Sequence, residues 1–270
     1  MNTYKNNYII LIALGLLVLI SGQLKADLVQ YDLTNPTNDP ELQIDNAWFY
    51  WVDASSTGSG VIDSFIQINT NNPIEQGYNS DYRSNKAPKG PEFDETNSKT
   101  FNHSLLLSAV PIVDLADDGT NILYREFLLD INQKNSEGDS LLSLDKIEIY
   151  LSNDKELHSY ATGWGSPIYS LDTANHDNYI LLDYALNHGS GSGDMLMYIP
   201  NDLFVGADYV YLYSMFGQNN INNGGFEEWA VRLGDGEIPP PPPPPVPVPG
   251  AVVLGMLGLL VAGKKLRKYA

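Results

Sequence analysis

Seven consecutive prolines at residues 239–245 restrict the fold of this chain more than any other feature of its sequence. Proline fixes φ near about −65° and has no backbone N–H, so the run suits neither a helix interior nor a sheet ladder. It predicts an extended polyproline II rod that rises about 3.1 Å per residue and holds the following segment away from the body. The rod therefore separates a body at residues 27–238 from a short C-terminal segment.

The body consists of short segments with the alternation of β-strands, separated by clusters of Gly, Asn, Asp and Ser. In one of them, Ile147 and Ile149 share one face, while Lys146 and Glu148 share the other. This period of two is typical of half-buried antiparallel strands. Ten segments are expected to be strands: 28–33, 47–52, 61–68, 105–113, 123–131, 144–151, 179–184, 195–199, 209–216 and 226–233.

Two other parts of the body have different patterns. Pro-Asn-Asp opens a short apolar segment at residues 200–204, which predicts a single helical turn. Residues 69–100 are polar and show no clear alternation, so we expect a long loop there. Because many short strands and no amphipathic helix are expected, the body is predicted to be a jelly-roll-like antiparallel β-sandwich.

The N-terminus has the layout of a secretory signal peptide. Lys5 precedes an apolar run at residues 8–20, and small and polar residues lead from there to Ala26. A positive start, an apolar stretch of about 7–15 residues and a small residue at the cut define such peptides. We expect cleavage after Ala26, so that residues 1–26 are removed. Cleavage after Gly22 and a buried N-terminal helix are the alternatives.

The C-terminus combines a short motif, an apolar run and a basic end. The apolar run at residues 251–263 is long enough for only about 20 Å of helix, against a bilayer core of about 30 Å. Four basic residues after it should stay on the cytoplasmic side. We therefore expect a linker with a sorting motif at residues 239–249 and a hydrophobic anchor with a basic tail at 250–270. The motif is Val246, Pro247, Val248 and Pro249, and the basic residues are Lys264, Lys265, Arg267 and Lys268.

This arrangement resembles the PEP-CTERM sorting signals of Gram-negative bacteria, in the variant that reads Val-Pro-x-Pro. The resemblance covers residues 246–270, with Val248 where the family's glutamate stands. It implies recognition in the inner membrane by an exosortase-type sorting enzyme and cleavage near the motif. It also implies transfer to the cell surface or the exopolysaccharide matrix. A plain membrane anchor without processing is the alternative.

Charge and composition exclude several classes of function. The body holds nine Lys and Arg against all 33 Asp and Glu, which gives it a formal charge of −24. Such a body is repelled by phosphates, so we expect no nucleic acid partner. The chain has no cysteine, which excludes disulfides, thiolate metal sites and a cysteine nucleophile.

Two groups of acidic and amide side chains are candidate calcium ligands. Asp114, Asp117 and Asp118 form one group, and Asp130 and Asn132 belong to the other. Calcium binds six to eight oxygen atoms of this kind. Neither group has EF-hand spacing, and Asp and Asn also favour turns without any metal. Calcium is therefore a candidate cofactor, and turn chemistry is the competing interpretation.

We expect no enzymatic activity. The Gly-Ser-Gly-Ser-Gly tract at 189–193 has Gly191 where a nucleophile elbow needs serine, and the four histidines are scattered. Glu227 and Glu228 are adjacent on an expected strand, so their side chains should point to opposite faces. Trp164 lies between two glycines in an expected loop, which makes it the first candidate for an exposed sugar contact.

These expectations combine into one hypothesis. The chain is predicted to be an all-β protein, an antiparallel sandwich flanked by two hydrophobic targeting helices. Its expected role is structural or adhesive, at the cell surface or in the exopolysaccharide matrix. The alternative is a carbohydrate-binding, lectin-like module, with or without calcium.

Overall fold

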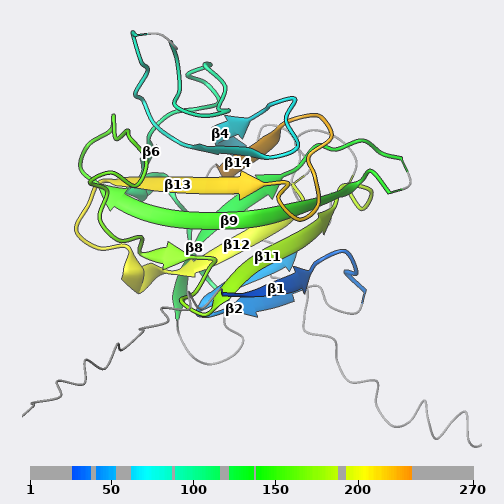
Figure 1. Ribbon diagram of the computed structural model, residues 1–270. Helices are drawn as coiled ribbons and strands as arrows, with labels where there is room; N and C mark the ends of the chain where they lie inside the picture. Colours follow the sequence, from blue (N-terminus) through cyan, green and yellow to red (C-terminus); the bar gives the residue numbers. More distant parts are fainter. Residues whose placement is uncertain are drawn as a thin grey trace, which may run out of the picture.

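A computed structural model of the protein describes residues 26–37, 41–52, 62–86, 89–115, 122–136, 138–187 and 193–232. Within these ranges, two seven-stranded sheets lie face to face, with β9, β11 and β13 in the nearer sheet of Figure 1. The described residues contain short 3₁₀ turns but no α-helix. Accordingly, no helix among them is long and apolar enough to cross a membrane.

The first sheet is mixed, because its edge strand β1 runs parallel to β11 while the other pairs are antiparallel. Its order is β1 (Asp27–Asp32), β11 (His176–Asp183), β9 (Leu141–Ser152), β13 (Tyr209–Phe216) and β5 (Glu75–Tyr78), with β10 (Tyr169–Ser170) beside β9 and β6 (Leu105–Leu106) beside β13.

The second sheet is antiparallel throughout. Its order is β2 (Glu41–Ile44), β3 (Ala47–Trp51), β12 (Met195–Pro200), β8 (Leu123–Asp130), β14 (Glu227–Arg232) and β4 (Ile62–Ile68), with β7 (Ile112–Asp114) beside β8. From β11 to β14, each strand crosses to the sheet opposite its predecessor. The 3₁₀ turns among the described residues are η2 (Leu107–Ala109) and η3 (Asn201–Leu203).

The space between the sheets is filled by apolar side chains from both of them. Phe65 and Phe127 of the second sheet belong to the same buried cluster as Ile147, Ile149 and Leu212 of the first. The alternation predicted for residues 144–151 is therefore confirmed: Ile147 and Ile149 face this core. Sandwich packing of two sheets follows from this shared core.

A β-bulge interrupts the pairing of β9 with β13. Met215 pairs with Lys146 and Phe216 pairs with Leu144, so Asp145 is the extra residue. Its carboxylate accepts hydrogen bonds from the backbone amides of Gln218 and Asn219 at 2.6 and 3.3 Å. The bulge thus aims a carboxylate at the turn after β13 and holds that turn in place.

The predicted fold class needs two corrections. β1 is parallel to β11, so the sandwich is not wholly antiparallel. The alternation of β1 identifies its faces but not the direction of its partner, which lies 149 residues away in the chain. The described structure is also all β and without α-helix, so it contradicts a sandwich flanked by two helices. The segments expected to form those helices, 1–26 and 250–270, lie outside the described residues, apart from Ala26.

Individual elements agree with the sequence to different degrees. The strand predicted at 209–216 matches β13, and the turn predicted at 200–204 is confirmed as η3. The strand predicted at 105–113 is divided by η2 into β6 and β7. The predicted loop at 69–100 contains β5, which has the sequence Glu-Gln-Gly-Tyr and no apolar alternation.

Candidate functional site

The outer surface of the first sheet carries a cluster of aromatic side chains, here called the aromatic face. It consists of Tyr78, Tyr150, Trp164, Tyr211 and Tyr213. Half-buried Phe93 and Tyr160 pack against it from the connecting segments. Because Tyr78, Tyr150 and Tyr213 come from β5, β9 and β13, the face ties three neighbouring strands together.

Trp164 lies inside the aromatic face. Only 8% of its surface is exposed, and its indole N–H donates to the carbonyl of His158 at 2.8 Å. Its ring meets Tyr78 and Tyr150 edge to face, with centroids 4.8 and 5.1 Å apart. The expectation that Trp164 is exposed for sugar contact is therefore wrong. Its flanking glycines indicate a loop, but they do not show that the loop folds back over the sheet.

Glu148 is the charged centre of the aromatic face. Its Oε2 accepts hydrogen bonds from the hydroxyls of Tyr150 and Tyr160 at 2.5 and 2.6 Å. Its Oε1 lies 2.9 Å from Nζ of Lys146. Burial by itself raises the pKa of Glu148, but these three donors outweigh burial and leave the pKa below its ordinary value. The aromatic face is thus internally satisfied and suited to a rigid structural surface.

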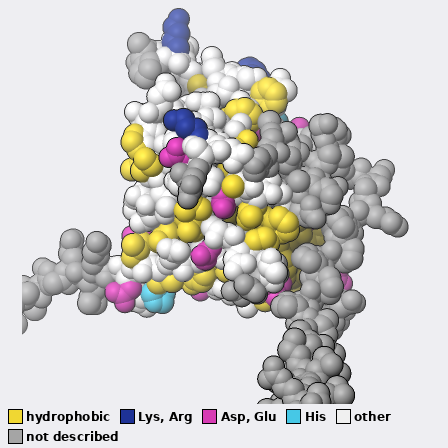
Figure 2. Space-filling view, turned by 90° about the vertical axis from the view of Figure 1, so that its right-hand side faces the viewer, with side chains coloured by type: hydrophobic (Ala, Val, Ile, Leu, Met, Phe, Trp, Pro, Cys, Tyr) yellow, Lys and Arg dark blue, Asp and Glu magenta, His cyan; other side chains and the backbone are white. Residues whose placement is uncertain are grey.

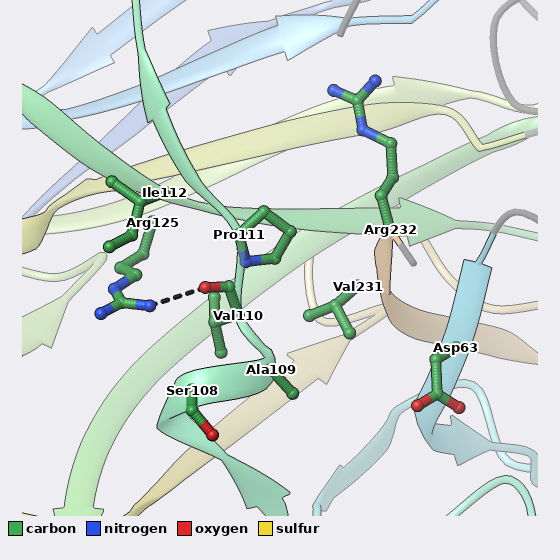
Figure 3. Close-up of a pocket in the computed structure, with 9 residues that line it drawn as sticks. All are labelled: Asp63, Ser108, Ala109, Val110, Pro111, Ile112, Arg125, Val231 and Arg232. Carbon is green, nitrogen blue, oxygen red and sulfur yellow. Dashed lines mark hydrogen bonds between the residues drawn. The ribbon is translucent and has the colours of Figure 1, made fainter. Parts of the chain in front are cut away.

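A groove of about 490 Å³ lies on the second sheet, lined by residues of η2, β4, β7, β8 and β14 (Figure 3). The guanidinium of Arg125 donates to the carbonyls of Leu107 and Val110 at 3.0 and 2.6 Å. It also donates to Oδ1 of Asn201 at 2.7 Å. Arg125 therefore anchors the 3₁₀ turn that divides β6 from β7.

The second arginine of the groove is paired as well. Arg232 forms a two-point ion pair with Glu126, which is 1% exposed. In Figure 3 its guanidinium points away from Pro111 and out of the groove. Both cations at the groove are engaged by the protein itself, so anion binding here would first have to break these contacts.

The two groups of predicted calcium ligands lie far apart. Asp114 ends β7 and pairs with Leu123 at the start of β8, whereas Asp130 is the last residue of β8. Seven residues of extended strand separate these ends by about 23 Å. Asn132 follows Asp130 in the next loop, and Asp117 and Asp118 lie outside the described residues. Within the described ranges, no three acidic or histidine side chains form a group suited to a metal.

Two buried glutamates form a contact that the sequence did not suggest. Glu75 of β5 and Glu227 of β14 are both fully buried, and their carboxyl groups lie within hydrogen-bonding reach of each other. Glu228 points the other way, since Oγ of Ser64 and Nε2 of Gln67 donate to it. The prediction that Glu227 and Glu228 face opposite sides is confirmed. No local pattern could reveal a pair about 150 residues apart on different sheets.

The predicted sorting residues fall mostly outside the structure. Ala26, the expected cleavage site, directly precedes β1. The others lie beyond Arg232, outside the described residues: Val246, Pro247, Val248, Pro249, Lys264, Lys265, Arg267 and Lys268.

No family model, no curated protein and no solved structure matches this chain.

Proposed function

We propose that this protein is exported by Gram-negative bacteria and that its body acts at the cell surface or in the exopolysaccharide matrix, in a structural or adhesive role. The observation behind the proposal is the order of features after the proline run. A Val-Pro-Val-Pro motif is followed by the apolar residues 251–263 and then by four basic residues. We further propose that an exosortase-type enzyme recognises and cleaves this tail.

The layout of the described fold supports this proposal. Its first strand begins at Asp27, so cleavage after Ala26 leaves β1 whole. Its last strand ends at Arg232, seven residues before the first proline of the rod. Cleavage near residues 246–249 would therefore leave every described strand intact.

The surface is also suited to an extracellular structural role. Acidic side chains are scattered among apolar ones on the face seen in Figure 2, and basic side chains are few there. A strongly acidic surface favours solubility and keeps copies of the protein apart. We expect no catalytic activity, and the sugar-binding alternative loses its main support because Trp164 is buried.

The tail is tested by measuring the C-terminal mass of the protein recovered from membranes and from culture supernatant of its native cells. We expect the mature protein to end near residues 246–249. Replacing Pro247 and Pro249 with alanine should block processing and leave the protein in the membrane fraction. Replacing Pro241 and Pro243 in the rod is the matched control and should leave processing unchanged. An intact tail in wild-type cells, confined to membranes, would refute sorting and leave an anchored protein.

A further inference from the structure

Glu75 and Glu227 lie at the same end of the sandwich, where the apolar core gives way to polar side chains. Glu75 is the first residue of β5 in one sheet, and Glu227 is the first residue of β14 in the other. Each has 0% of its surface exposed. Their carboxyl groups meet between the sheets, so this contact links the two layers.

The pair has too few hydrogen-bond donors for its charge. Neither Oε1 nor Oε2 of Glu75 accepts a well-formed hydrogen bond, and neither does Oε2 of Glu227. Nε2 of Gln133 donates to Oε1 of Glu227 at 2.6 Å. The backbone amides of Thr70 and Asn132 favour the charged forms from nearby. Apart from the contact of the two carboxyl groups with each other, three buried carboxyl oxygens therefore lack a well-formed hydrogen bond.

Among the residues that the structure describes, no cation is paired with Glu75 or Glu227. The further charge that acts on Glu75 is that of Asp94, which is also negative. In the described part of the chain, the ion pairs join Lys146 to Glu148 and Arg232 to Glu126. Burial raises the pKa of Glu75 to about 7 and raises that of Glu227 as well. A pair of this kind must either hold a proton or bind a cation.

The loops around the pair are held in place independently of the two carboxyl groups. The backbone amide of Asn222 donates to the carbonyl of Pro73 at 2.9 Å, and its side-chain oxygen accepts from Gln133 at 3.1 Å. Gly225 has φ of +98°, and a Cβ there would lie only 2.0 Å from the carbonyl oxygen of Asn132. Such close packing keeps two like-charged groups together, which is the preorganisation that a binding site requires.

We propose that Glu75 and Glu227 bind a divalent cation, with calcium as the best match. The ligands would be both oxygens of Glu75 and Oε2 of Glu227, the atoms without hydrogen-bond donors. Calcium prefers carboxylate oxygens at about 2.3–2.6 Å, so two ligands of one ion lie about 3 Å apart, as they do in a hydrogen bond. Zinc favours nitrogen and sulfur ligands, and magnesium demands near-ideal octahedral geometry at about 2.0–2.1 Å. The bound ion neutralises the pair and joins the two sheets, whether or not the C-terminal tail is sorted.

The test measures thermal unfolding of the full-length chain, purified in mild detergent and freed of metals with a chelator. Adding Ca²⁺ at a hundredfold excess over its Kd should raise Tm by about 5–10 °C. Mg²⁺ at the same concentration should raise it less. Glu75→Gln should abolish the Ca²⁺-dependent rise. Glu156→Gln removes an exposed carboxylate and is the matched control, which should keep the full rise.

A second measurement covers the case in which Glu75→Gln fails to fold. Terbium, a luminescent substitute for calcium, should bind the wild-type protein and be sensitised by Trp229, two residues from Glu227. Millimolar Ca²⁺ should displace it. Absence of terbium emission together with no Ca²⁺-dependent change in Tm at pH 7.5 would overturn the proposal and leave a shared proton between the two carboxyls. A Ca²⁺-dependent rise that survives in folded Glu75→Gln would overturn it too, because the ion would then bind elsewhere.

Discussion

Glu148 and Glu75 are two carboxylates of the same sheet whose pKa values are shifted in opposite directions. Glu148 lies on the aromatic face, and Glu75 lies between the sheets. Burial by itself would raise the pKa of both carboxyl groups. Glu148 accepts hydrogen bonds from two tyrosine hydroxyls and forms an ion pair with a lysine, so its pKa lies below the ordinary value. Glu75 meets another carboxyl group instead, and its pKa rises to about 7. The difference between these two buried carboxylates therefore lies in their partners: three donors surround Glu148, whereas a second carboxyl group faces Glu75.

The comparison also separates two kinds of site. The aromatic face is complete, since Glu148 is satisfied by the protein's own groups, so it acts as structure. The Glu75–Glu227 pair is incomplete without a proton or an ion. Three sets of measurements test this difference, in order of decreasing expected effect.

Truncating Trp164 should disrupt the packing of the aromatic face. Trp164→Ala removes a buried indole that contacts Tyr78, Tyr150 and Tyr160. Loss of this packing should lower the free energy of unfolding by about 3–5 kcal/mol. Urea denaturation measures the effect. Trp48→Ala, at a half-buried tryptophan of β3, should cost less. A loss below about 1 kcal/mol for Trp164→Ala would show that the face is loosely packed.

The pH dependence of the free energy of unfolding should report on the Glu75–Glu227 pair. The pKa of Glu75 is raised from 4.5 to about 7 in the folded protein, mainly by burial. A carboxyl group that holds its proton more tightly in the folded state contributes stability at low pH. This contribution is lost as pH rises from about 4.5, the unfolded pKa, to about 7, the folded pKa. In chelator, the free energy of unfolding should therefore fall over this window as the Glu75–Glu227 pair loses its proton.

Glu95 provides the internal reference for that pH experiment. Its pKa is also raised to about 7 by burial, but its carboxylate accepts the amides of Tyr78 and Phe93 at 2.9 and 2.8 Å. Calcium should remove the part of the pH slope that belongs to Glu75 and leave the part that belongs to Glu95. Glu95→Gln should remove only the latter. A profile that is flat between pH 5 and 8 in chelator would contradict both assignments.

Removing the charge of Glu148 should have the smallest effect. Glu148→Gln weakens the hydrogen bonds from Tyr150 and Tyr160 and should cost about 1–2 kcal/mol at pH 7. A lowered pKa contributes stability above the unfolded pKa, and this contribution is lost as pH falls through the folded pKa. The variant and the wild type should thus converge in acid. Lys146→Met should cost less than about 1 kcal/mol, because the ion pair is partly exposed. Equal losses at pH 7 and pH 3 would show that charge is not involved.

Prediction from sequence worked best where alternation is strong and local. The strand at 209–216 was predicted with the bounds of β13, and the inward face of β9 was predicted correctly. β2 and β5 were missed because each is only four residues long, and β5 has no alternating apolar residues. Among the candidate site residues, Trp164 was correctly predicted to lie in a loop, but the loop packs it against the sheet instead of exposing it. The two calcium candidate groups were predicted in separate turns, and the structure places Asp114 and Asp130 near opposite ends of β8.

The sequence by itself determined the period of the strands and the faces of their side chains, because neighbouring residues set these properties. Tertiary structure alone decided the parallel pairing of β1, the burial of Trp164 and the meeting of Glu75 with Glu227. Each of these depends on contacts between segments far apart in the chain. Local patterns show which way a side chain points, but only packing shows what it meets there.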